Sequence, residues 1–121
     1  MYKIYSYKDL KVWQKAMELV VEIYNLTELF RKKEIYGLTA HLRKTSISIP
    51  SNIAEGRCRG SKKEYLQFLR IAYGSSAELE TQIEIAKRLK MTGSLNYTIV
   101  DSLLLEVLKM LRMMIKKMSL N

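Results

Sequence analysis

Apolar side chains recur every three or four residues along most of this chain, which is the spacing of one face of an α-helix. Four segments carry the pattern, at residues 10–24, 35–53, 61–89 and 96–118. Short polar or glycine-containing stretches separate these segments, and none of them has the alternating pattern and tight turn of a β-hairpin. The pattern therefore predicts four long helices joined by short connections.

Residues that start or stop helices lie at the ends of the segments. Asp9 fits an N-cap or a first-turn acid of the first helix. The residues SKKE at 61–64 form the pattern of a capping box that opens the third helix. Gly93 fits the end of the third helix, and Asn96 fits the cap of the fourth.

The second segment contains the chain's only proline, Pro50. A proline inside a helix removes one backbone hydrogen bond and presses against the carbonyl of Ser46, so a kink is expected there. Gly56 fits the C′ residue that ends this helix. The expected fold is all-α, an up-down-up-down antiparallel four-helix bundle kinked at Pro50 in its second helix, with residues 1–121 forming a single domain.

Composition agrees with this class and adds a strong charge. The 121 residues are 48% hydrophobic and 27% charged, and 21 basic against 12 acidic residues give a net charge of +9. Such a balance favours anionic partners. A single cysteine suits a reducing compartment, and the chain has neither a signal-peptide pattern nor an apolar run of about 18 residues. A soluble, cytoplasmic protein that does not enter a membrane is expected.

The chain offers little for catalysis or for metal binding. His41 is the only histidine and lacks the Glu-x-x-His spacing of a di-iron bundle, and Cys58 has no second cysteine with which to bind zinc. Cys58 lies between Arg57 and Arg59, which favours a reactive thiol, but no complete triad surrounds it. GRCRGSKK lacks the spacing of a phosphate loop. We therefore expect no enzyme, no cofactor and no metal.

Positive charge is the remaining functional signal. Seven basic and two acidic residues lie between residues 41 and 70, and a further set follows the last helix at Lys109, Arg112, Lys116 and Lys117. Phosphate backbones attract such clusters without regard to base sequence. The candidate phosphate contacts are Arg43, Lys44, Arg57, Arg59, Lys62 and Lys63. A protein-interaction scaffold, with a basic surface that serves an acidic protein or solubility, is the alternative.

The apolar faces of the last two helices are wider than a lone bundle requires. Leu105, Met110 and Met113 fall outside the main stripe of the fourth helix, and Gly74 with its small neighbours would let another backbone approach closely. Extra apolar width indicates a further surface to cover, commonly that of another copy of the chain. The pattern therefore predicts a homo-oligomer.

Three stretches resemble a known family: YKDLKVWQKAMELVVEIY, LTAHLRKTSISIPSNIAEG and GSKKEYLQFLRIAYGSSAELETQIEIAKRL. The chain is similar over about residues 5 to 118 to the four-helix-bundle proteins encoded in intervening sequences of large-subunit ribosomal RNA genes of bacteria. That family in turn resembles the accessory protein of diversity-generating retroelements, a basic homopentamer that associates with a reverse transcriptase and nucleic acid. The resemblance implies a five-membered ring without enzymatic activity.

The resemblance also assigns signature positions. In the second helix these are Ser48, Pro50, Asn52, Ala54, Glu55 and Gly56. In the third helix they are Gly74, Ser75, Glu78, Leu79 and Glu80. It implies structural roles for them: a kink, a helix end, a close helix contact, and caps or polar contacts between subunits. Arg31 stands where the family has a proline, which implies a looser connection between the first two helices.

Overall fold

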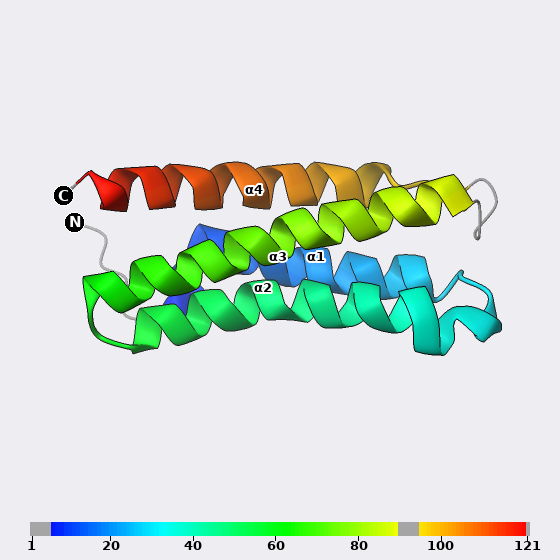
Figure 1. The fold of residues 1–121 in the computed structure, drawn as a ribbon, viewed down its shortest axis with the longest axis horizontal. Coiled ribbons are helices and arrows are strands. Elements are labelled where there is room, and N and C mark those ends of the chain that lie inside the picture. Colours follow the sequence, from blue (N-terminus) through cyan, green and yellow to red (C-terminus); the bar gives the residue numbers. More distant parts are fainter. Residues whose placement is uncertain (1–5, 90–94, 121) are drawn as a thin grey trace.

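The protein is almost entirely helical (Figure 1). The computed structural model describes residues 6–89 and 95–120, and of residues 34–36 it describes the backbone alone. Four long helices are α1 (Lys11–Thr27), α2 (Ala40–Cys58), α3 (Lys62–Leu89) and α4 (Thr98–Ser119). Three short turns are η1 (Tyr7–Asp9), η2 (Lys32–Glu34) and η3 (Ile35–Thr39). The described residues contain no strand, so the all-α prediction with four helices is confirmed.

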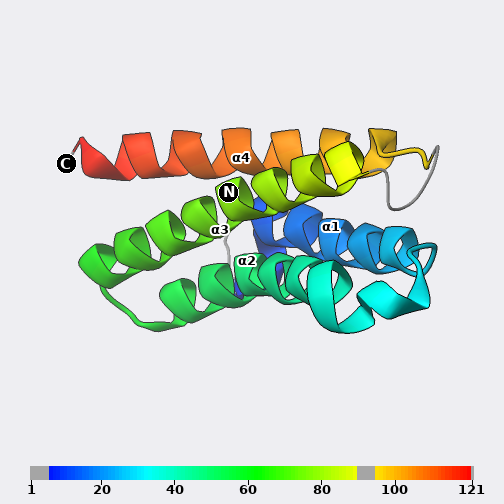
Figure 2. The ribbon, with the colours of Figure 1, turned by 45° about the vertical axis from the view of Figure 1, so that its right-hand side comes forward.

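The helices run alternately up and down, and each packs against two neighbours (Figures 1 and 2). The helix pairs in contact are α1 with α2, α2 with α3, α3 with α4, and α4 with α1. Consequently α2 and α4 lie at opposite corners of the bundle, with α4 at the top and α2 at the bottom of both views. The core is mainly apolar, and Leu19, Leu42, Leu79 and Leu111 supply one fully buried leucine from each helix.

The connection between α1 and α2 is the irregular part of the described chain. The 3-10 turn η2 leads into η3, a π-helical turn in which Gly37 has the non-helical angles φ −100° and ψ −114°. The helix that the apolar pattern starts at residue 35 therefore becomes regular only at Ala40. The interruption lies at Gly37, while α2 continues without a break through Pro50. A bend at Pro50 stays a prediction.

The prediction that Gly56 ends the second helix is wrong. α2 continues to Cys58, and the residue with the left-handed backbone is Gly60, at φ +87°. Gly56 is buried where α2 passes α3, and a Cβ atom placed on it would lie 2.5 Å from the Cβ of Phe68. The glycine is needed because the two helices approach closely there.

Small polar residues continue this close packing along α2 and α3. Ser46 and Ser76 are fully buried, and each hydroxyl donates a hydrogen bond to a carbonyl of its own helix, that of Arg43 at 2.9 Å or of Ala72 at 2.9 Å. Because each hydroxyl has a hydrogen-bond partner in its own helix, its burial leaves no unpaired polar group. Ser46 and Ser76 therefore belong to the packing of the bundle.

Capping side chains confirm part of the predicted boundaries. The Ser61 hydroxyl accepts the N–H of Glu64 at 3.1 Å, and the Glu64 carboxylate accepts the Ser61 hydroxyl rather than its backbone N–H. The Asn96 side chain accepts the N–H of Thr98 at 2.9 Å, but the N-cap of α4 is Tyr97, so Asn96 lies one residue before the position predicted for it. Asp9 is the last residue of η1, where it forms a capping box with Ser6, and it does not cap α1. The predicted helix end at Gly93 lies outside the described residues.

Candidate nucleic-acid interface

Positive charge gathers at one end of the bundle. The start of α1, the turn between α2 and α3 and the end of α4 all lie at that end, on the left in Figure 1. We call it the basic end and define it as residues 6–12, 54–72 and 108–120. It holds eleven lysines and arginines against three acids, a net charge of +8. The rest of the described chain has eight basic and nine acidic residues, a net charge of −1. The charge of this protein is therefore almost wholly a property of one end.

Four cations of the basic end come from the turn between α2 and α3, and we call them the α2–α3 cations: Arg57, Arg59, Lys62 and Lys63. The Arg59 guanidinium binds the carboxylates of Glu55 and Glu64 and lies 4.9 Å from the centre of the Phe68 ring. Lys62 and Lys63 are exposed and make no ion pair or side-chain hydrogen bond with the described residues. The turn thus presents one fixed guanidinium beside two ammonium groups that are available to a ligand.

The last turns of α4 supply a second group, the α4 cations: Lys109, Arg112, Lys116 and Lys117. All four are exposed, and none makes an ion pair with a described residue. Arg70 of α3 donates a hydrogen bond to the Ser119 hydroxyl at 3.3 Å, which ties the start of α3 to the end of α4. Lys8 and Lys11 complete the basic end from η1 and α1. Because these elements are far apart in the sequence, only the fold brings their cations together.

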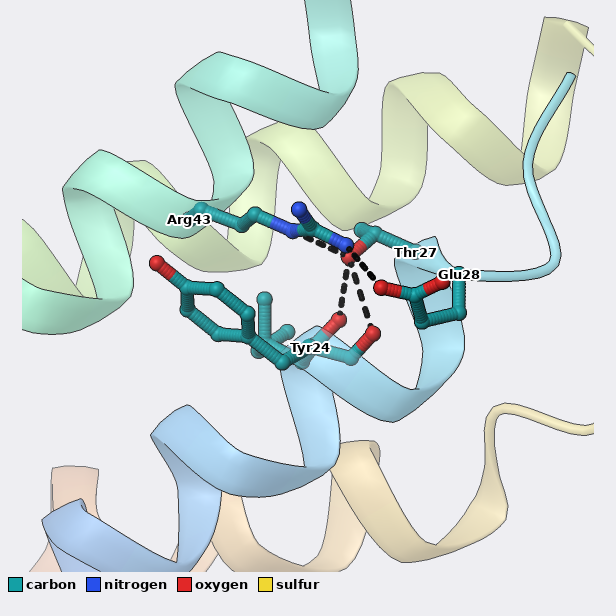
Figure 3. A network of polar contacts seen from close by, with 5 residues as sticks. Tyr24, Thr27, Glu28 and Arg43 are labelled. Atoms are coloured by element: carbon teal, nitrogen blue, oxygen red, sulfur yellow. Dashed lines mark hydrogen bonds and ion pairs between the residues drawn. The ribbon is translucent and has the colours of Figure 1, made fainter. Parts of the chain in front are cut away.

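Two of the six predicted phosphate contacts do not join this group. Arg43 and Lys44 lie near the start of α2, about fourteen residues or roughly 20 Å along the helix from Arg57. The Arg43 guanidinium donates to the Thr27 hydroxyl at 2.8 Å and to Glu28 at 3.3 Å, and it lies 4.4 Å from the centre of the Tyr24 ring (Figure 3). Arg43 therefore joins α1 to α2.

Tyr65 marks the inner boundary of the basic end. Its hydroxyl is buried and has no hydrogen-bond partner among residues 6–89 and 95–120. Burial raises the pKa of the Tyr65 hydroxyl, and the nearby positive charge of Arg57 opposes part of that rise. The ring fills space beside Gly56, where α2 and α3 approach closely. Tyr65 thus serves the packing beneath the cations.

The side chains considered for catalysis are not brought together. His41 and Cys58 are both exposed, at opposite ends of α2 and about seventeen residues, or roughly 25 Å, apart. Within residues 6–89 and 95–120, no cluster of three or more metal-ligating side chains occurs. No helix among those residues is both long and apolar enough to span a bilayer.

The signature positions of α2 and α3 divide between packing and surface. The Asn52 amide donates to the carbonyl of Ser48 at 2.7 Å, beside the buried Pro50. Gly74 is exposed, and a Cβ atom on it would meet nothing within 4 Å. Among the described residues, Gly74 therefore makes no close helix contact of the kind expected. Ser75 is half-buried next to it, and Glu78 and Glu80 lie on the exposed side of α3.

An apolar groove runs between α1 and α4, which the sequence did not locate. One hollow of about 660 Å³ is lined by Met17, Val21, Ile99 and Leu103 with an acidic rim that includes Glu22, and a second of about 380 Å³ is lined by Leu10, Met110 and Met113 with Lys11 and Lys109 on its rim. Val21 is 56% exposed and Met113 is 68% exposed. This α1–α4 groove is acidic at one end and basic at the other.

The opposite corner of the bundle carries a matching row of exposed side chains. We call it the α2 outer stripe: Lys44, Ile47, Ser51 and Glu55. Lys44 and Glu55 are eleven residues apart, as are Lys11 and Glu22 on α1, and eleven residues of helix span roughly 16 Å. Since α1 and α2 run in opposite directions, Lys44 lies at the end of the bundle that holds Glu22, and Glu55 at the end that holds Lys11.

Comparison with known proteins supplies a family and a fold. Residues 8–113 match the family model described as 23S rRNA-intervening sequence protein. The chain is similar to a crystal structure of a protein of unknown function from the S23 ribosomal protein family of Bacteroides thetaiotaomicron, at 24% identity and a TM-score of 0.78. That match covers 87% of this chain and 95% of the other. A search of curated proteins found no match.

Proposed function

Since the chain belongs to the 23S rRNA-intervening sequence protein family, we propose that it is a non-catalytic accessory protein whose basic end binds the phosphate backbone of nucleic acid. The observation that carries this proposal is the net charge of +8 at one end of a bundle that is otherwise nearly neutral. A charge that served solubility alone would spread over the surface. A concentrated field of one sign attracts a polyanion and accelerates its association.

The position of Lys62 and Lys63 supports the proposal. Both lie in the first turn of α3, where the helix dipole is positive and cations reduce the stability of the helix. The dipole that repels them attracts an anion, and exposed backbone N–H groups of the first turn add hydrogen-bond donors. Placing two lysines there opposes folding and favours binding of a phosphate.

We further propose that the protein acts as a homo-oligomer in which the α2 outer stripe of one copy lies in the α1–α4 groove of the next. With two copies side by side in the same direction, Ile47 meets the apolar floor of the groove. Lys44 then faces Glu22 and Glu55 faces Lys11 of the adjoining copy, at equal spacing on both surfaces. Two different surfaces in contact produce a closed ring or an open chain.

This arrangement places every basic end on the same side of the assembly. Phosphate contacts that are weak in one copy would then add, because the copies bind one polyanion together. The resemblance implies five copies, which for a 14.2 kDa chain is about 71 kDa. A reverse transcriptase as protein partner rests on the resemblance alone.

Binding of a labelled RNA stem-loop, followed by fluorescence anisotropy over a range of salt concentrations, tests the proposed function. The natural protein should bind at about 0.15 M salt, with log affinity falling linearly against log salt. Replacing Lys62→Glu and Lys63→Glu should reduce the affinity at least tenfold and make the salt slope shallower by about two. The glutamates suit the start of a helix, so this variant should stay folded.

The matched control is Lys32→Glu with Lys33→Glu, which makes the same change of charge at the other end of the bundle, on η2. It should leave affinity within about threefold of the natural protein, because long-range attraction is screened at this salt. Equal losses of RNA affinity in both double variants would show that binding responds to net charge alone. Absence of binding by the natural protein would reject nucleic acid and direct the search to an acidic protein.

Light scattering tests the assembly. The natural protein should have a mass several times 14.2 kDa, and Ile47→Asp should shift it toward the single chain, because it places a charge on the apolar floor. Lys44→Glu should weaken association and the added change Glu22→Lys should restore it. Ile85→Lys, on the exposed side of α3, is the control. If the charge-swapped double variant associates more weakly than either single variant, the proposed contact is refuted.

A further inference from the structure

We infer that the basic end recognises double-helical nucleic acid in preference to single strands, an inference that rests on the proposed function. The shared chemistry of the ligand is a pair of phosphate backbones held at a fixed separation. Three features of the basic end support it: two separate groups of cations, side chains held in place, and the lack of an available aromatic face.

The α2–α3 cations and the α4 cations come from different helices: Arg57 and Arg59 lie at the end of α2, diagonally across the bundle from α4, and Lys62 and Lys63 open α3, the helix between them. Neighbouring helix axes lie about 8–10 Å apart, so the axis of α4 is separated by roughly 8–10 Å from that of α3 and by roughly 11–14 Å from that of α2, and long side chains carry the charges a few ångströms further. The two backbones of a duplex border grooves of about 6 and 12 Å in B-DNA. Two groups of cations at this separation can contact both backbones, whereas an unpaired strand offers only one.

Part of the surface is fixed before a ligand arrives. Arg59 is held by Glu55, Glu64 and the Phe68 ring, and Arg70 is held by the Ser119 hydroxyl. A duplex is rigid and presents its phosphates at fixed positions, so it loses little conformational freedom on such a surface. An unpaired strand has to be ordered on binding, which reduces its affinity.

Proteins that hold single strands stack the bases on aromatic side chains. Among the described residues of the basic end and its border, each aromatic ring is engaged in packing. Tyr7 and Trp13 pack against each other edge to face at 5.5 Å, Phe68 lies beneath Arg59, and Tyr65 is half-buried beside Gly56. With cations present and stacking surfaces occupied, backbone contacts to a double helix are the mode of binding that remains.

The test compares a blunt RNA duplex, a DNA duplex of the same sequence and an unpaired RNA with the same number of phosphates, by anisotropy at about 0.15 M salt. At least one duplex should bind at least tenfold more tightly than the unpaired strand. The duplex that binds more tightly shows whether the two backbones belong to RNA or to DNA. Equal or tighter binding of the unpaired strand would overturn the inference and leave the proposed function standing, whereas no binding to any probe would reject both.

Variants of each group of cations sharpen the test. Lys62→Glu with Lys63→Glu and, separately, Arg112→Glu with Lys116→Glu should each weaken duplex binding at least tenfold, because both groups contact the ligand. If one of these variants binds the duplex as the natural protein does, the two-backbone geometry is wrong. Lys32→Glu with Lys33→Glu serves again as the control, and circular dichroism with light scattering establishes that fold and mass are unchanged.

Discussion

Replacing Gly56 by alanine gives the sharpest test of how α2 packs on α3. The new Cβ would lie 2.5 Å from the Cβ of Phe68 and 3.3 Å from the Tyr65 ring. The first contact is with an atom fixed to the backbone of α3, so a side-chain rotation cannot relieve it and the helices have to separate. Overfilling a packed core in this way costs about 1–3 kcal/mol.

Alanine also favours a helix over glycine by about 1 kcal/mol, which offsets part of that cost. The net loss for Gly56→Ala should therefore be up to about 2 kcal/mol, which lowers Tm by several degrees for a chain of this length. Gly74→Ala is the matched control, because it is the same substitution within a helix and its Cβ would meet nothing within 4 Å. It should raise stability by about 0.5–1 kcal/mol.

Urea unfolding followed by circular dichroism at 222 nm measures both variants, at one protein concentration because assembly would link stability to concentration. Both alanines favour the helix to a similar extent, so Gly56→Ala should be less stable than Gly74→Ala by the overpacking cost of about 1–3 kcal/mol. A Gly56→Ala protein as stable as Gly74→Ala would refute the close approach of α2 and α3. If Gly74→Ala alone lost assembled mass, that position would belong to a contact between copies.

Three further predictions concern single side chains. The pKa of Tyr65 is raised in the folded protein, so its contribution to stability is complete below about pH 10 and is lost as pH rises through the pKa of the folded state. Phenylalanine does not ionise, so Tyr65→Phe should lose less stability than the natural protein when urea unfolding is repeated at rising alkaline pH. Ser61→Ala removes the acceptor for the Glu64 N–H and should cost about 1 kcal/mol in the same assay; an unchanged midpoint would deny that Ser61 caps α3. Arg43→Met removes the bond to Thr27 and should lower Tm while leaving the affinity for the RNA stem-loop within about threefold; a large loss of affinity without loss of Tm would return Arg43 to the phosphate contacts.

Local sequence determined the elements of this fold. Apolar spacing, together with the scarcity of proline and glycine, was sufficient to predict four helices, because helical periodicity is a property of consecutive residues. The cap of α3 by Ser61 was predictable for the same reason, whereas the N-cap of α4 is Tyr97, one residue after the predicted Asn96. The role of Gly56 was not, because its position past a buried stretch resembles a helix end, and only the approach of Phe68 from another helix explains it.

The candidate site depended on tertiary structure. A run of basic residues along the sequence suggested one cluster from Arg43 to Lys63, yet fourteen residues of helix separate Arg43 from Arg57. Thr27 at the end of α1 and Glu28 just after it bind Arg43. The α4 cations join the α2–α3 cations only because alternate helices reverse direction and return the end of α4 to the same end of the bundle. Helices follow from short-range spacing in the chain, whereas a charged surface is a sum over residues from distant segments, and packing of the bundle decides which segments meet.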